Sequence, residues 1–207
     1  MGFYERQIFP RVMNVMMASA AMQAVRRDVL AGTRGRVLEV GFGTGLNIDH
    51  YPSSVTELIG IDTNRGMEAI ARRRITHASM SAAVTYTDGG RLPFADRTFD
   101  TVVTTWTLCS VADVAGVLVD IRRVLKLDGR FHFVEHGLSP DIAVRRWQRR
   151  LNRINRMVAC GCNLDRDIRG LVSSFFRLDA LKEFYFPEAP RVAGYFYQGV
   201  ASAEVAV

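Results

Sequence analysis

The sequence predicts a doubly wound α/β fold, a mostly parallel sheet with helices on both faces and a late antiparallel strand. Two observations carry this prediction. Short apolar, β-branched runs alternate with stretches of helical periodicity along most of the chain, as expected for parallel strands joined by crossover helices. Several of the apolar runs end directly at an acidic residue, and ligands of such folds bind beyond the carboxyl ends of the strands.

The size and composition of the chain suit one domain with a substantial core. It has 207 residues, of which 48% are hydrophobic and 23% charged, values typical of globular proteins. No repeat, low-complexity segment or linker divides it. We therefore expect a single domain over residues 1–207, with a helical cap over 1–31 and the sheet core over 32–207.

The N-terminal segment is the first expected element. Residues 3 to 31 carry methionines and other apolar residues at helical spacing, such as Val15, Met22 and Val25. This periodicity predicts a helix, interrupted near Pro10. The cap is a plausible adaptable lid, because methionine side chains fit apolar ligands of varied shape; plain core packing is the alternative.

The remaining elements alternate between strand and helix. Strands are expected at residues 37–40, 58–61, 83–87, 100–105 and 130–135. Helices are expected at 67–77, 114–125 and 142–158. The run 100–105 is β-branched and almost uncharged, as a strand covered on both faces should be. Two late runs, 177–186 and 192–201, would close the sheet as an antiparallel hairpin.

A glycine-rich turn follows the first strand, in the run Gly41-Phe-Gly-Thr-Gly45. Alternating glycines allow backbone to approach a ligand closely and permit positive φ. A dinucleotide-binding turn has the spacing G-x-G-x-x-G, whereas here the third glycine comes one residue earlier. Glu39 precedes the turn, and its carboxylate suits a cation and would repel a pyrophosphate. The turn therefore favours the methionine end of S-adenosylmethionine (SAM), which carries an ammonium and a sulfonium.

Three further polar residues stand at the ends of the next strands. Asp62 comes 21 positions after Gly41, where an acid can accept both ribose hydroxyls. Asp88 ends the third strand, where it can accept from an adenine amino group, and Thr105 ends the fourth. One such residue is often only a loop or capping residue. The ordered set together with the glycine turn predicts a SAM site.

The successive motifs resemble those of class I SAM-dependent methyltransferases, which have a Rossmann-like fold. These motifs are Glu39-Val-Gly-Phe-Gly-Thr-Gly45, Gly60-Ile-Asp62, Asp88-Gly-Gly-Arg-Leu-Pro-Phe94, Phe99-Asp-Thr-Val-Val103 and Arg123-Val-Leu-Lys-Leu-Asp-Gly129. Within that superfamily the chain is similar to small bacterial enzymes that resemble the animal methyltransferase-like thiol methyltransferases. The subgroup features are Gly45-Leu-Asn47, Leu108-Cys-Ser-Val111, Glu135-His136, Trp147-Gln148, Gly161-Cys-Asn-Leu-Asp-Arg166 and Tyr195-Phe-Tyr-Gln-Gly199.

The resemblance implies roles at the methionine end of the cofactor. Glu39 would hold the ammonium, directly or through water. Gly41, Gly43 and Gly45 would line the methionine portion. Asn47 would help to fix this loop. The product formed from the cofactor would be S-adenosyl-L-homocysteine.

It also implies roles at the nucleoside end. Asp62 would bind the ribose, with Thr63 beside it. Asp88 and the amide of Gly89 would hold the adenine. Thr105 would pass near the cofactor at the end of the fourth strand.

The resemblance favours a thiol as the methyl acceptor, in a small, fairly apolar molecule. A phospholipid head group or a quinone, methylated at a membrane surface, is the alternative. A SAM-binding protein without turnover and a nucleic-acid-binding protein are lower alternatives. The segment Thr104-Thr-Trp-Thr107 lacks the Asn/Asp-Pro-Pro-aromatic run of enzymes that methylate base amino groups, so we expect no nucleic-acid partner.

The residues expected near the methyl group follow the fourth and fifth strands. His136 is the candidate base, and Trp106 could wall the acceptor pocket; a structural histidine and a sheet-covering aromatic are the alternatives. Cys160 and Cys162 lack the spacing of a zinc site, so no metal is expected. The chain has only three cysteines, which is typical of a reduced, cytoplasmic protein.

The predicted helix over residues 142–158 is strongly basic. Trp147, Leu151, Ile154 and Val158 form an apolar stripe between arginines. We favour a helix that packs on the domain through this stripe and exposes its basic face. A peripheral contact with an anionic membrane is the alternative, and the net charge of +6 is compatible with both. The oligomeric state stays open.

Overall fold

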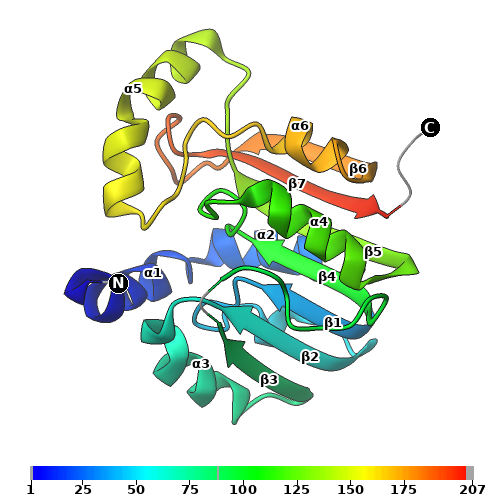
Figure 1. Ribbon diagram of the computed structural model, residues 1–207. Coiled ribbons are helices and arrows are strands. Elements are labelled where there is room, and N and C mark those ends of the chain that lie inside the picture. The colour runs from blue at the N-terminus through cyan, green and yellow to red at the C-terminus, as the bar shows by residue number, and fades with distance from the viewer. Residues whose placement is uncertain (1, 88, 204–207) are drawn as a thin grey trace.

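The computed structural model describes residues 2–87 and 89–203, so that Asp88, a predicted adenine-binding residue, lies outside the described part. Seven strands form one sheet in the order β3-β2-β1-β4-β5-β7-β6 (Figure 1). The strands are β1 (Gly35–Val40), β2 (Val55–Asp62), β3 (Ser81–Tyr86), β4 (Phe99–Thr105), β5 (Leu125–His136), β6 (Arg177–Tyr185) and β7 (Tyr195–Ser202). Only β7 runs antiparallel to its neighbours, β5 and β6. The predicted fold class is confirmed.

Helices cover both faces of the sheet (Figure 1). They are α1 (Phe9–Met16), α2 (Ala20–Leu30), α3 (Glu68–Ile75), α4 (Val114–Val124), α5 (Ile142–Val158) and α6 (Ile168–Ser173), with short turns η1 (Tyr4–Ile8), η2 (Ile48–His50) and η3 (Arg65–Met67). Adjacent strand residues enter different cores: Val102 packs with α4 and α6, and Val103 packs with α2 and α3. Period-2 alternation of side chains in a doubly covered strand requires this division.

The N-terminal helical segment is interrupted twice rather than once. Pro10 lies in the first turn of α1, where a missing N–H costs nothing, and the π-helical turn η1 precedes it. The second interruption follows Met17. There Ser19 begins α2 by accepting a hydrogen bond from the Met22 amide at 3.3 Å, as an N-cap does.

Most predicted bounds differ from the observed ones by a few residues, and the largest departures are in β5 and α6. Strand β5 begins at Leu125 rather than at Arg130, because Leu125 pairs with Phe99 before a register shift in the ladder with β4. The glycine in Leu127-Asp-Gly129, which reads as a turn, is carried within the strand. The six-residue helix α6 was not predicted, since it is too short for a periodic signal.

Helix α5 is turned with its apolar stripe outward, which contradicts the favoured prediction. Trp147, Ile154 and Val158 are 56%, 60% and 55% exposed. An amide stripe, formed by Gln148, Asn152 and Asn155, faces the rest of the domain instead. Gln148 bonds to backbone of Ser139 and Gly137, Asn152 to Leu164, and Asn155 to Cys162. These backbone groups need partners when buried, and amide side chains on one helix face supply them.

Candidate active site

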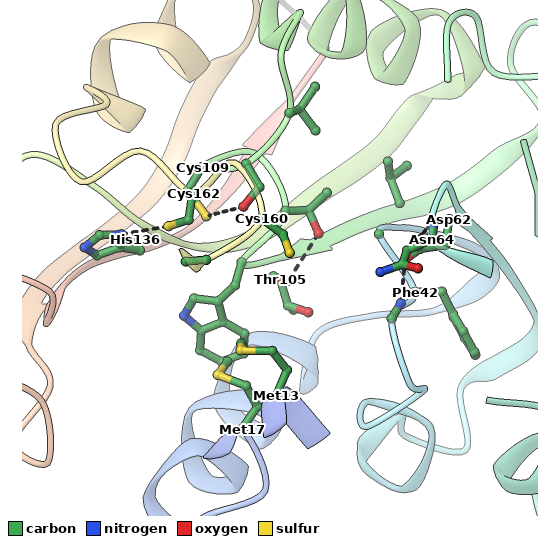
Figure 2. Close-up of a pocket in the computed structure, with 18 of the residues that line it drawn as sticks. Met13, Met17, Phe42, Asp62, Asn64, Thr105, Cys109, His136, Cys160 and Cys162 are labelled. Carbon is green, nitrogen blue, oxygen red and sulfur yellow. Dashed lines mark hydrogen bonds between the residues drawn. The ribbon is translucent and has the colours of Figure 1, made fainter. Parts of the chain in front are cut away.

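A cavity of about 1210 Å³ opens at the carboxyl edge of the parallel strands. It lies where β1 and β4 are neighbours and the strand order reverses, the usual ligand position in such sheets. Figure 2 shows Asp62 and Asn64 at one end, His136 and Cys162 at the other, and Thr105 between them in this view. A cavity of this size exceeds a typical drug-sized pocket, so it can hold a cofactor and an acceptor together.

Gly43 is the glycine of the turn whose missing side chain faces the open cavity. All three glycines have positive φ, 80° at Gly41, 57° at Gly43 and 78° at Gly45. A Cβ on Gly43 would meet nothing closer than 4.0 Å, whereas one on Gly41 would lie 2.0 Å from the Thr107 hydroxyl. Gly45 packs against Phe42 and does not line the cavity. The backbone of Gly43 is thus accessible to a ligand in the cavity.

Glu39 lies at the centre of a buried hydrogen-bond network beneath the turn. It is 1% exposed, and its carboxylate accepts from the amide of Asn47 at 2.7 Å and from the hydroxyl of Tyr51 at 2.8 Å. Asn47 also donates to the Thr105 hydroxyl at 3.1 Å. Burial raises the pKa of Glu39 to about 7. A cation that binds next to such a carboxylate stabilises its ionised form and lowers its pKa.

Arg26 of α2 is a site residue that the sequence analysis missed. It is 5% exposed, and its guanidinium donates to Asn47 at 2.6 Å and lies 4.7 Å from the centre of the Trp106 ring. Its Nε has no partner among the described residues. Burial lowers its pKa to about 10, which leaves it charged. A buried cation that lines the cavity beside Glu39 suits the carboxylate of the methionine end of SAM.

Asp62 holds together two loops at one end of the cavity. Its oxygens accept from the amides of Gly43 and Asn64, each at 2.7 Å. Burial raises the pKa of this carboxyl. Thr63 and Gly89 line the same part of the cavity. A carboxylate offers about four acceptor positions, so Asp62 can still accept from a ribose hydroxyl.

His136 and two cysteines form the opposite end of the cavity (Figure 2). The imidazole Nδ1 lies 3.4 Å from the Cys162 sulfur. The other ring nitrogen, Nε2, is buried and has no partner among the described residues. Hydrogen bonds from Cys109 and His136 lower the pKa of the Cys162 thiol, and the Cys109 pKa is raised by the same contact and by burial. A Cys162 sulfur that accepts a hydrogen bond from Nδ1 keeps the His136 proton on that nitrogen and leaves the lone pair on Nε2.

Glu135, the neighbour of His136, serves the loop after β4. It is fully buried and accepts from the backbone amides of Thr107 at 3.1 Å and Cys109 at 3.2 Å. Burial raises its pKa to about 7. Its role is to fix the loop that carries Cys109.

A further part of the cavity wall is apolar and rich in sulfur. Met13, Met17 and Met22 reach the cavity from the N-terminal helices, and Phe196 reaches it from β7. Trp106, the possible acceptor wall, lines the cavity and stacks edge-on against Phe196 at 5.8 Å. Its φ of 52° is unusual for a bulky residue. The methionines of the N-terminal cap thus line the cavity, and the role of this cap as a lid stays a prediction.

Two further features concern metals and membranes. In the part of the chain that the structure describes, no three His, Cys, Asp or Glu side chains come together as a metal site. Among residues 2–87 and 89–203, no helix has the length and apolar composition needed to cross a bilayer.

Comparison with known proteins places the chain in a family. A family model described as a methyltransferase domain matches residues 38–133. A thiol S-methyltransferase of Homo sapiens is 31% identical over 166 residues, 77% of this chain and 68% of that protein. A demethylmenaquinone methyltransferase of Symbiobacterium thermophilum is 32% identical over 64% of this chain and 59% of its own length. A phosphatidylethanolamine N-methyltransferase of Cereibacter sphaeroides is 36% identical over 49% of this chain and 51% of its own length.

The fold agrees with these relationships. A methyltransferase solved in complex with the Haloferax volcanii Trm112 activator superposes with a TM-score of 0.69 over 97% of this chain and 96% of that one, at 16% identity. The matched stretches of the demethylmenaquinone and phosphatidylethanolamine enzymes span less than two thirds of those proteins. The human relative is matched over a longer share. The chain therefore belongs to the class I SAM-dependent methyltransferases, and SAM is its cofactor.

Proposed function

We propose that this enzyme transfers the methyl group of SAM to the sulfur of a small, apolar thiol. The observation that carries the proposal is the acceptor end of the cavity, which is lined by His136 and Cys162 together with methionine and aromatic side chains. An apolar wall with one proton acceptor suits an uncharged thiol. The thiol S-methyltransferase among the relatives supports this choice.

The cofactor would lie along the cavity with its methionine end at Glu39 and Arg26. Glu39 would hold the ammonium and Arg26 would hold the carboxylate. The backbone of Gly43 would contact the methionine portion of the cofactor. Asp62 would accept from the ribose, with Thr63 beside it. Gly89 would hold the adenine together with Asp88, to which the family resemblance gives the same role. Gly45 and Asn47 would support the site indirectly. Gly45 packs the turn, and Asn47 links Arg26 to Glu39.

Bound SAM supplies an electrophilic methyl group on a positively charged sulfur. The chain's own task is to hold the acceptor in line with that group, to exclude water and to receive a proton. His136 would accept the thiol proton on its imidazole, and Cys162 contacts that imidazole at Nδ1. His136 is thus the proposed catalytic residue and Cys162 a positioning residue. The displaced product, S-adenosyl-L-homocysteine, is a neutral thioether and needs no acid.

A quinone or a phospholipid head group is the second candidate acceptor. The demethylmenaquinone and phosphatidylethanolamine enzymes among the relatives favour it. Both acceptors reside in bilayers, so this alternative requires contact with a membrane.

An acceptor panel tests the proposal. The enzyme is incubated with methyl-labelled SAM and matched aliphatic and aromatic thiols, amines, phenols, a demethylated quinone and phosphatidylethanolamine vesicles. We expect label in the thiols, identified by mass spectrometry as S-methyl products. Label in the quinone, the lipid or the amines without label in any thiol would refute the thiol proposal.

Glu39 should make SAM affinity depend on pH. Its pKa of about 7 in the free protein means that it is protonated below that pH. A bound ammonium favours the carboxylate, so binding must release a proton at low pH, and affinity rises as pH increases. Each pKa unit is about tenfold in affinity, so we expect at least roughly a tenfold gain between about pH 5 and pH 7, and none above.

Calorimetric titration with SAM across this pH range measures the effect, and Glu39→Gln is the matched control. The variant should bind more weakly, with a flat pH profile. If the wild type shows no pH dependence, or if the variant keeps the same dependence, Glu39 does not face the ammonium.

A further inference from the structure

Helix α5 presents an outer face that nothing in the described structure covers. With its amide stripe bound to the body, it exposes Trp147, Ile154, Met157 and Val158, of which Met157 is 74% exposed. The same helix contains no acidic residue and six arginines, namely Arg145, Arg146, Arg149, Arg150, Arg153 and Arg156. The outer face of α5 therefore combines bare apolar side chains with a uniform positive charge.

Helix α1 also exposes apolar side chains. Its exposed residues include Val15 and Met16, 74% and 64% exposed. The Tyr4 hydroxyl donates to the backbone carbonyl of Val158 at 2.8 Å, which joins the N-terminal segment to the end of α5. In Figure 1 both helices lie on the side of the molecule where the carboxyl ends of the parallel strands point.

Both helices also border the active-site cavity. Phe9 and Met13 of α1 line it, as do Asn155 of α5 and Ala159, which follows that helix. The two helices that expose these apolar side chains therefore also contribute residues to the cavity.

We propose that the outer face of α5, together with the exposed side of α1, docks on an anionic lipid bilayer. Apolar side chains enter the interface while flanking arginines meet the head groups, and both terms add to affinity. The entrance of the cavity then faces the lipid, and apolar acceptors reach it without crossing water. This inference goes beyond the proposed function, because docking does not depend on which atom is methylated.

Two other occupants fit the surface less well. A second copy of the chain would bring arginine-rich helices against one another, and like charges at close range repel. Single-stranded nucleic acid binds through aromatic side chains that alternate with the basic ones. On α5 only Trp147 is aromatic, and Arg150 already lies 5.4 Å from the centre of its ring.

Vesicle cosedimentation of the full chain at physiological salt tests the proposal. Vesicles of phosphatidylcholine with about a third phosphatidylglycerol should bind the protein at least roughly tenfold more strongly than pure phosphatidylcholine. Arg149→Glu/Arg153→Glu should remove this preference, and Ile154→Ser/Met157→Ser should weaken binding to both vesicles. Arg34→Glu/Arg122→Glu, the same charge change at exposed positions near the amino edge of the sheet, should bind like the wild type.

Three results would overturn the proposal. The first is equal binding to neutral and anionic vesicles, or no binding. The second is a loss that the control variant shares, which would assign binding to net charge alone. The third is a dimer, or an oligonucleotide complex tighter than the vesicle complex, that the α5 variants disrupt. Because only binding is measured, each of these outcomes leaves the thiol proposal standing.

Discussion

Asp62→Ala should lower SAM affinity by on the order of 100-fold or more. The side chain accepts from the amides of Gly43 and Asn64 at 2.7 Å, and its remaining lone pairs face the place proposed for the ribose. Hydrogen bonds to a charged group contribute about 1.5–3 kcal/mol each, and about 1.4 kcal/mol is tenfold in affinity. Loss of two such bonds to the ribose, with a loosened turn, gives the expected factor. Calorimetric titration measures it.

Asp62→Asn is the matched control for this experiment. Its amide keeps the shape and one acceptor oxygen, so it should lose less affinity than the alanine variant. Thermal unfolding without ligand separates binding from folding, since the alanine variant also leaves two amides unpaired. An alanine variant that remains folded and binds SAM within a few-fold of the wild type would remove Asp62 from the site.

His136→Ala should lower turnover of an aliphatic thiol by roughly 100-fold or more near pH 7, the range seen for loss of a general base. SAM affinity should be unchanged, because the imidazole lies at the opposite end of the cavity from Asp62 (Figure 2). The defect should shrink as pH rises above about 8.5, where a free thiol ionises without help. Aromatic thiols, which ionise at lower pH, should be less affected.

Two variants control the histidine experiment. His77→Ala changes an exposed histidine outside the cavity and should leave turnover intact. Cys162→Ser replaces the sulfur that contacts Nδ1 of His136, so it should lower turnover less than His136→Ala and shift the pH profile. Turnover by His136→Ala that matches the wild type at every pH would show that the enzyme needs no base at this position.

Local patterns were sufficient to predict the fold and the cofactor side of the cavity. Strand ends are marked by a change from apolar to acidic residues within a few positions, and Glu39 and Asp62 lie where that pattern puts them. Parallel strands bring their carboxyl ends to one edge, so the sequence alone indicates which of these residues meet. The binding role of each residue stays a prediction, and Asp88 lies outside the described residues.

The rest depends on packing between distant elements, which local patterns do not report. Arg26 is one arginine of two on an ordinary amphipathic helix, and only the docking of α2 brings it to Asn47. Cys162 meets His136 because the loop after α5 folds back over β5. The predicted orientation of α5 was wrong because an apolar stripe usually marks the buried face of a helix. Here Gln148 and Asn155 face inward instead and satisfy buried backbone groups.

One measurement tests the central claim most directly: the site of methylation in an acceptor that offers two nucleophiles. An aromatic aminothiol carries a thiol and an amine on one small apolar ring, so both groups enter the same cavity at the same concentration. After reaction with methyl-labelled SAM near pH 7, the account predicts the S-methyl product almost exclusively, with its yield reduced in His136→Ala. A product methylated on nitrogen, with the thiol intact, would contradict it.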